Sequence, residues 1–239
     1  MKAFFPKTWR EGFFVYYCPM QKYAVIVAGG SGTRMQSEIP KQFIELKGLP
    51  ILMHTINAFH FDNIQIILVL PGDQIDFWKQ LIDQYDFKTP HQTVIGGSER
   101  FDSVKNGLKS ISSEEGLVAI HDGVRPLIDR KIINRSFEVA SKNGNAIVSI
   151  ALKDSIRSVD PTANRQEDRS RFRLIQTPQT FQLKLIKQAF EQPFDPLFTD
   201  DASVLEKAGF SINLIEGSYQ NIKITTPEDL LIAESFLTT

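Results

Sequence analysis

The chain has 239 residues, a formal net charge of −1 and one cysteine, which suits one large domain or two small ones with a sizeable core. The balanced charge gives no basic excess for nucleic acid or an anionic membrane, and no apolar run approaches the roughly 20 residues that span a bilayer. A single cysteine excludes an internal disulfide and is typical of a reducing compartment, so we expect a cytoplasmic protein with neither nucleic acid nor membrane as partner.

Residues 1–20 differ from the rest of the chain, because they are rich in aromatic side chains and show no stable hydrophobic period. A secretory signal needs an uninterrupted apolar segment, which Lys7 and Arg10 interrupt. One interpretation is a targeting or membrane-touching arm with its aromatics at an interface. We favour a loosely ordered extension, with Met20 as an alternative start, followed by a single domain over residues 21–239.

The domain begins with a short apolar run, Tyr23–Val27, which has the composition of a buried strand. A turn rich in glycine follows it, and backbone N–H groups in such a turn can approach an anion without obstruction by Cβ atoms. Arg34 and Lys41 add two positive charges beside this turn. The turn therefore indicates a phosphate site, and its glycines are Gly29, Gly30 and Gly32.

Two common phosphate-binding motifs do not match this turn. The Walker spacing G-x-x-x-x-G-K-[ST] does not occur, and Met35 stands where a dinucleotide-binding fingerprint has its third glycine. A bare G-x-G also occurs in purely structural turns. The turn alone therefore leaves a structural role open.

From Pro50 to Ile150 the chain alternates helical and extended patterns. We expect a helix starting at Pro50 and further helices near residues 77–85, 104–111 and 132–140, where apolar side chains recur at helical spacing. Alternating strands and helices imply right-handed crossovers. The fold class is therefore α/β, a Rossmann-like three-layer fold with a mostly parallel twisted sheet. The expected strands are Ile66–Leu70, Thr93–Ile95, Leu117–Ile120 and Ala146–Ile150.

Ligands of such sheets bind beyond the carboxyl ends of the strands. Three loops leave apolar strands here, Gly29–Arg34, Gly96–Ser98 and His121–Arg125, and should open on the same edge. Asp122 is a candidate ligand of Mg²⁺ or ribose, although an aspartate after a strand is also a common helix cap.

The pattern changes at about residues 153–177. Two runs that alternate polar and apolar residues, Lys153–Val159 and Arg171–Ile175, flank a polar turn and predict a projecting β-hairpin. Regular α/β order then returns. We expect helices near Leu183–Phe190 and at Asp201–Ala208, ended by Gly209, then a strand at Ile212–Ile215, the segment Asn221–Thr225 and a last helix from Pro227.

The string A-G-G-x-G-T-R-M, residues 28–35, with P-K-Q at residues 40–42, resembles the signature of sugar-phosphate nucleotidyltransferases. It looks most like the 2-C-methyl-D-erythritol 4-phosphate cytidylyltransferase family, and the resemblance covers Gln21–Thr239. The other matching strings are G-G-x-E-R-x-D-S at 96–103, H-D-x-x-R-P at 121–126, T-P-Q at 177–179, T-D-D-A-S at 199–203 and N-I-K-I-T-x-P-E-D at 221–229.

The resemblance implies transfer of CMP from CTP to 2-C-methyl-D-erythritol 4-phosphate, giving 4-diphosphocytidyl-2-C-methyl-D-erythritol and pyrophosphate in non-mevalonate isoprenoid biosynthesis. It also implies Mg²⁺ or another divalent cation, held mainly by the triphosphate, with Asp122 as candidate protein ligand. The implied catalytic residues are Arg34, Lys41 and Lys223. The implied nucleotide-binding residues are Ala28, Gly29, Gly30, Gly32, Gly97, Ser98, Ser103 and Asp122, and the implied acceptor-binding residues are Asp122, Arg125, Ser155, Arg169 and Thr177.

Two positions depart from the family pattern. Ser98 stands where an aspartate is frequent, and Gln220 replaces a common acid; neither change removes a phosphate-binding cation. The reaction needs no general base, because the second pKa of a phosphate monoester is near 6. Repulsion between anions limits the attack, and fixed cations relieve it. We therefore expect His121 to be structural.

The nearest alternative is a ribitol-5-phosphate cytidylyltransferase, which shares these motifs. A nucleotide-sensing module without catalysis is a second alternative, disfavoured because both Arg34 and Lys41 are retained. The resemblance favours a hairpin arm exchanged across a two-fold axis in a homodimer, with Arg169 reaching the neighbouring subunit's site. A flap folded over its own domain is the other interpretation of the arm.

Overall fold

The computed structural model describes residues 20–29, 35 and 39–237. The predicted extension, apart from Met20, lies outside this part of the chain. So do three predicted site residues, Gly30, Gly32 and Arg34.

A seven-stranded sheet forms the centre of the domain, in the order β11-β7-β10-β6-β1-β4-β5. Strands β1, β4, β5 and β6 run parallel to one another, β11 runs parallel to β7, and β10 lies antiparallel to both of its neighbours. The prediction of a mostly parallel sheet is therefore confirmed. The strands are β1 Lys22–Val27, β4 Gln65–Leu70, β5 Gln92–Ile95, β6 Leu117–Asp122, β7 Asn145–Ala151, β10 Arg173–Gln182 and β11 Leu214–Glu216.

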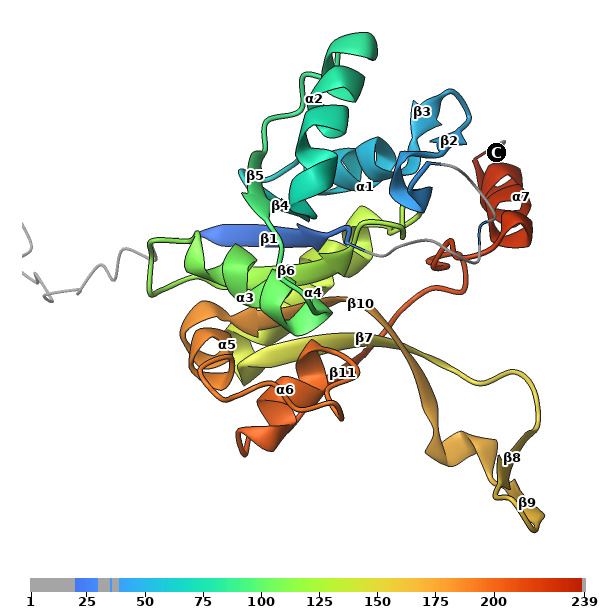
Figure 1. Ribbon diagram of the computed structural model, residues 1–239. Coiled ribbons are helices and arrows are strands. Elements are labelled where there is room, and N and C mark those ends of the chain that lie inside the picture. Colours follow the sequence, from blue (N-terminus) through green and yellow to red (C-terminus); the bar gives the residue numbers. More distant parts are fainter. Residues whose placement is uncertain (1–19, 30–34, 36–38, 238–239) are drawn as a thin grey trace, which may run out of the picture.

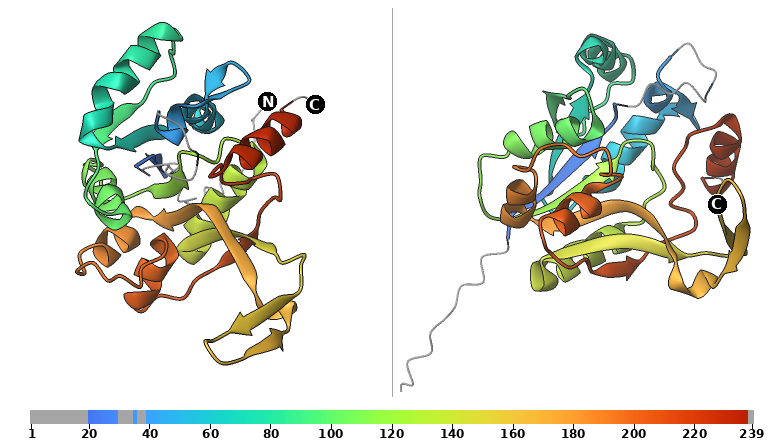
Figure 2. Two further views of the ribbon diagram at one scale, coloured as in Figure 1. Left: turned by 45° about the vertical axis from the view of Figure 1, so that its right-hand side comes forward. Right: turned by 60° about the horizontal axis from the view of Figure 1, so that its bottom comes forward.

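Helices cover both faces of the sheet, giving the expected three layers (Figures 1 and 2). Side chains of β1 alternate between the faces: Ala24 and Ile26 pack with α1, α2 and α4, whereas Val25 packs with α3, α5 and α6. The first group comprises α1 Ile51–Phe59, α2 Ile75–Gln84 and α4 Arg130–Asn143, and the second comprises α3 Arg100–Lys109, α5 Leu183–Ala189 and α6 Asp201–Lys207. An apolar run buried on both faces is what a central parallel strand requires.

The last helix, α7 Pro227–Phe236, belongs to a smaller apolar cluster. It packs beside a two-stranded ribbon, β2 Glu45–Leu46 and β3 Leu49–Pro50, which the sequence analysis did not predict. Within the described residues, no helix has the length and apolar character needed to cross a membrane.

Most predicted boundaries hold to within two or three residues. The helix predicted near residues 104–111 begins four residues earlier, at Arg100, and the strand predicted at Ile212–Ile215 is Leu214–Glu216. Pro50 is the N-cap of α1 rather than its first residue. Gly209 follows α6 with a φ of +91°, the left-handed conformation that ends many helices. Pro227 opens α7 as predicted, after a capping box between Thr226 and Asp229.

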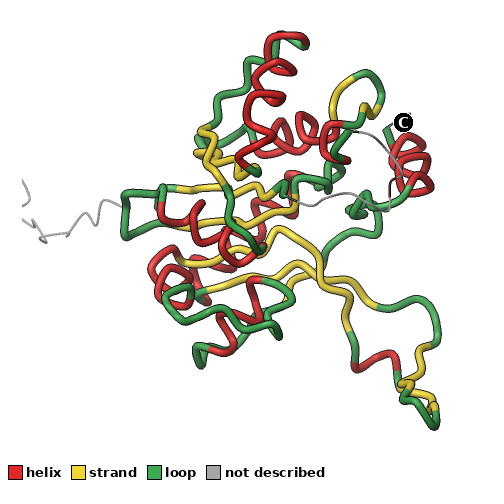
Figure 3. Tube along the Cα trace, in the orientation of Figure 1, coloured by secondary structure: helices red, strands yellow, loops and turns green. Residues whose placement is uncertain are grey.

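A hairpin does project from the domain, but its second strand was predicted at the wrong residues. Strand β8, Ile156–Val159, pairs with β9, Asn164–Glu167, away from the three layers (Figure 3). The run Arg171–Ile175 is not the return strand, because Arg173–Ile175 begins β10 and pairs with β7 in the central sheet. An alternating pattern shows that a segment is extended and does not identify its partner strand. We call residues 153–172 the arm.

Candidate active site

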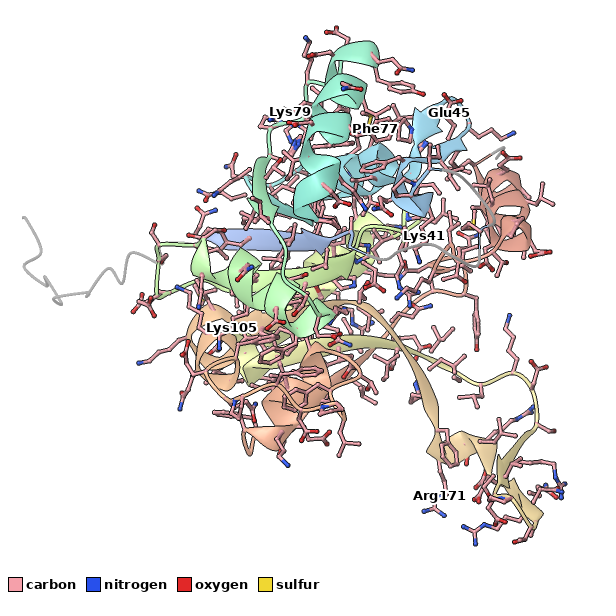
Figure 4. The ribbon with its side chains drawn as sticks, viewed as in Figure 1. Lys41, Glu45, Phe77, Lys79, Lys105 and Arg171 are labelled. Carbon is pink, nitrogen blue, oxygen red and sulfur yellow. The ribbon has the colours of Figure 1, made fainter. Side chains whose placement is uncertain are left out.

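A cavity of about 310 Å³ opens where β1 and β6 end. It joins the loop after β1, the loop before α3, the end of β6 and the segment before α7, so the predicted convergence of loops is confirmed for the described residues. Figure 4 shows Lys41 at this side of the domain and Arg171 on the arm, away from it. The lining residues are Val27, Ala28, Gly29, Lys41, Gln42, Pro71, Gly97, Ser98, Glu99, Arg100, Ser103, Asp122, Val124 and Lys223.

The loop before α3 is shaped by its glycines and by the start of the helix. The Gly97 N–H donates to Ser103 Oγ at 3.1 Å. A Cβ atom on Gly97 would lie 2.2 Å from the Cβ of Asp102, so only glycine fits this position. Because Glu99 and Asp102 form a capping box at the helix start, the loop backbone is held against the N-terminus of α3. Helix N-termini favour anions, which suits a phosphorylated ligand.

Gln42 supports the loop after β1, a contact that the sequence analysis missed. Its side chain is 1% exposed, and Nε2 donates to the Ala28 carbonyl at 3.0 Å and to Gln74 Oε1 at 2.6 Å. Ala28 in turn donates its N–H to Val69 O. Gln42 therefore holds the end of β1 where the glycine turn starts. The P-K-Q string contained it, but only its lysine carried an expected role.

Asp122 lies among three cations from different parts of the chain. Its Oδ2 is 3.0 Å from Lys223 Nζ and 3.3 Å from Arg125 Nε, and its Oδ1 is 3.8 Å from Arg100 Nε. Burial by itself raises the pKa of Asp122, but Arg100, Lys223 and Arg125 outweigh burial and hold the pKa well below its ordinary value. Asp122 is therefore ionised at neutral pH, and it gathers the cations at one point.

A second cavity of about 260 Å³ adjoins the first. Arg100, Asp122 and Lys223 line both cavities. Predicted acceptor residues Arg125 and Thr177 line the second, and Thr177 Oγ1 accepts a hydrogen bond from the Asp122 N–H at 3.1 Å. Its remaining lining residues are Ile175, Gln176, Gln179, Thr199 and Asp200.

Asn221 anchors the segment that contains Lys223 through hydrogen bonds. No sequence pattern predicted this role. Asn221 is fully buried, its Nδ2 donates to Thr177 O at 2.8 Å, and its carbonyl accepts from Arg125 Nη1 at 2.8 Å. These bonds tie residues before α7 to β10 and to the loop after β6. These bonds hold the segment in which Lys223 Nζ lies 3.0 Å from Asp122 Oδ2.

His121 lines neither cavity. Its ring is fully buried, lies 4.9 Å from the Phe59 ring centroid, and has Nε2 3.1 Å from Arg125 O. Burial lowers the pKa of His121 to about 4, so the ring is neutral at pH 7. This environment agrees with a structural role.

Two predicted acceptor residues, Ser155 and Arg169, lie exposed on the arm and line neither described cavity. Arg169 donates a hydrogen bond to the Lys153 carbonyl. Within the described part of one chain, the arm therefore contributes neither side chain to either cavity. Among the described residues, no group of three or more His, Cys, Asp or Glu side chains is arranged to hold a metal ion.

Comparisons with known proteins agree on one family. The family profile described as 2-C-methyl-D-erythritol 4-phosphate cytidylyltransferase matches residues 22–239. A protein of that name from Bacteroides thetaiotaomicron is 46% identical over 220 residues, covering 91% of this chain and 100% of the relative. Its counterpart from Azobacteroides pseudotrichonymphae is 50% identical over 220 residues, covering 91% and 99%.

Solved structures give the same result. A 4-diphosphocytidyl-2C-methyl-D-erythritol synthase from Anaerococcus prevotii superposes with a TM-score of 0.78 at 30% identity, covering 92% of this chain and 99% of the other. A 2-C-methyl-D-erythritol 4-phosphate cytidylyltransferase from Thermus thermophilus has a TM-score of 0.73 at 27% identity, covering 92% and 100%.

Proposed function

The chain belongs to the 2-C-methyl-D-erythritol 4-phosphate cytidylyltransferase family, and from this premise we propose that it transfers CMP from CTP to 2-C-methyl-D-erythritol 4-phosphate. The products are 4-diphosphocytidyl-2-C-methyl-D-erythritol and pyrophosphate, in isoprenoid biosynthesis. The observation that carries the proposal is the pair of adjoining cavities, which share Arg100, Asp122 and Lys223. A cation at this boundary, Lys223, would offset the repulsion between two anionic substrates.

In the reaction, a phosphate oxygen of the acceptor attacks the α-phosphorus of CTP. A bond forms between that oxygen and the phosphorus, and the bond from the phosphorus to the bridging oxygen of the β-phosphate breaks. Pyrophosphate leaves with the electron pair. The attacking oxygen is already ionised at neutral pH, because the second pKa of a phosphate monoester is near 6. The protein therefore has to orient two anions and offset their repulsion.

We assign the first cavity to the nucleotide. The backbone around Ala28, Gly29 and Gly97, with the Ser98 and Ser103 side chains, would hold the cytidine nucleotide. Lys41 and Lys223 would stabilise the charge that develops on the α-phosphate. Arg34, Gly30 and Gly32 keep their proposed roles from the family resemblance alone.

We assign the second cavity to the acceptor, with Arg125 and Thr177 on its walls and Asp122 at its boundary with the nucleotide. The single carboxylate at this boundary fits a divalent cation carried mainly by the triphosphate, since Mg²⁺ commonly uses one or two carboxylates together with substrate phosphates. Asp122 would be its protein ligand. Bound there, Mg²⁺ would neutralise charge on the triphosphate oxygens.

We further propose that the arm pairs with a second copy of the chain. A two-stranded ribbon is only marginally stable alone in water, and Val159 and Phe172 on the arm, with Leu174 just beyond it, are 78%, 42% and 52% exposed. A symmetric dimer would cover these side chains and would bring Ser155 and Arg169 to the partner's acceptor cavity.

Pyrophosphate release tests the assignment of substrates. Each nucleoside triphosphate is paired in turn with 2-C-methyl-D-erythritol 4-phosphate and with ribitol 5-phosphate. The proposal requires the highest kcat/KM for CTP with the methylerythritol phosphate. A preference for ribitol 5-phosphate would favour the alternative enzyme, and binding of CTP without turnover would indicate a nucleotide-sensing module.

A further inference from the structure

An ion pair joins the first residues of two helices that are distant in sequence. Arg100 begins α3 and Asp201 begins α6, 101 positions later. Arg100 Nη1 and Nη2 donate to the two carboxylate oxygens of Asp201 at 2.8 and 2.7 Å. The Asp201 side chain is 1% exposed. Such a two-bond pair fixes both the distance and the relative orientation of its partners.

The loop before each of these helices lines one of the two cavities. Helix α3 follows the loop that lines the nucleotide cavity with Gly97 and Ser98. Helix α6 follows Thr199 and Asp200, which line the acceptor cavity. The pair therefore links the two walls across the boundary between the cavities.

Arg100 also faces the carboxylate of Asp122. Arg100 lines both cavities, and its Nε lies 3.8 Å from Asp122 Oδ1 while both of its terminal nitrogens bond Asp201. The residues on either side of Asp201 are held by Gln179 of β10. Gln179 Nε2 donates to Asp200 Oδ2 at 2.8 Å, and Gln179 Oε1 accepts from the Ala202 N–H at 2.8 Å. The start of α6 is thus fixed to β10 and, through Arg100, to α3.

We propose that Arg100 and Asp201 are positioning residues that set the distance between the nucleotide and the acceptor phosphate. This role rests on the proposed function. It goes further by assigning the alignment of the two substrates to a pair whose two hydrogen bonds join the walls of the two cavities. Misplacing reacting groups by about 1 Å can cost about 10²-fold in rate. The pair should therefore affect turnover far more than the binding of either substrate alone.

Four variants test the pair. Arg100→Lys keeps the charge but loses the planar two-bond contact. Asp201→Asn keeps the shape but removes the charge, and the double variant combines the two. Asp201→Glu keeps the charge with a longer side chain, so it tests the geometry even if Asp201→Asn fails to fold. Ser136→Ala is the matched control, because it removes the buried hydrogen bond of 2.8 Å that Thr180 Oγ1 in β10 donates to Ser136 Oγ in α4, outside both cavities.

The measurements are kcat, KM for each substrate, the melting temperature, and the Kd of CTP by titration calorimetry without acceptor. We expect kcat to fall about 10²-fold in each single variant, while the Kd of CTP stays within about threefold of wild type. The double variant should be no slower than the slower single variant, because the two residues act as one unit. The Ser136→Ala control should lower the melting temperature and leave kcat unchanged.

Two results would overturn the positioning role. Single variants that fold and keep wild-type kcat would show that the pair is only structural. A rise in the Kd of CTP by the same factor as the fall in kcat/KM would show that Arg100 binds the nucleotide directly. Failure of the wild-type chain to release pyrophosphate with any acceptor would instead overturn the proposed function, and the positioning role with it.

Discussion

Replacing Gly97 by alanine tests whether the loop before α3 holds the nucleotide. The new Cβ would lie 2.2 Å from the Asp102 Cβ and 3.2 Å from its backbone carbonyl carbon. Carbon atoms in contact normally lie about 3.5–4.0 Å apart, so the loop has to move by more than about 1 Å. Displacement on this scale can cost about 10²-fold in rate. We therefore expect kcat/KM for CTP to fall about 10²-fold.

Gly72→Ala is the matched control, because its Cβ would meet only Ile95 Cγ2, at an ordinary 3.6 Å. Steady-state pyrophosphate release at varied CTP measures kcat/KM for both variants, and thermal unfolding verifies that both fold. The control should stay within about twofold of wild type. A folded Gly97→Ala enzyme with wild-type kcat/KM for CTP would refute the assignment of this loop.

Four further outcomes are expected. Lys41→Ala should lower kcat about 10²–10³-fold, since it removes a donor to charge that develops in the transition state; near wild-type turnover would show that Lys41 has no such role. A chelator should abolish activity, and Asp122→Asn should raise the Mg²⁺ concentration that gives half-maximal rate. The same Mg²⁺ concentration for half-maximal rate in the variant and the wild type would exclude Asp122 as ligand. The contribution of His121 to the free energy of unfolding should fall by about 2 kcal/mol between pH 7 and pH 5, because unfolded His121 binds a proton that the buried ring, with a pKa of about 4, does not. In urea titrations, a His121→Gln variant should lack this loss of stability. The same pH dependence in the variant and the wild type would contradict the assignment to His121. Mixed dimers of Lys41→Ala and Arg169→Ala chains should regain activity towards half of wild type if the arm acts in trans, and no recovery despite verified subunit exchange would place Arg169 in its own chain's site.

The sequence predicts those parts of the fold that depend on local patterns. Tyr23–Val27 is apolar at every position, which identifies a strand buried on both faces. The position of Asp122 near Gly97 also follows, because parallel strands end at a common edge. These features need no knowledge of which helix packs on which strand.

Contacts between distant segments could not be predicted in the same way. Alternation at Arg173–Ile175 is the same whether the partner strand lies in the arm or is β7, so the pattern left the pairing undetermined. The bond between Arg100 and Asp201 joins two helix starts, where no hydrophobic period exists to reveal it. The role of Asn221 depends on the path of the segment before α7 across β10, which only the folded chain shows.

Transfer of a labelled phosphate tests the central claim most directly. CTP carrying ³²P at the α-position is incubated with the chain, Mg²⁺ and 2-C-methyl-D-erythritol 4-phosphate, and the products are separated. The proposed reaction requires the label to move into 4-diphosphocytidyl-2-C-methyl-D-erythritol, only when the acceptor is present, with one unlabelled pyrophosphate for each product formed. Label that stays in CTP, or that leaves as CMP whether or not the acceptor is added, would contradict it.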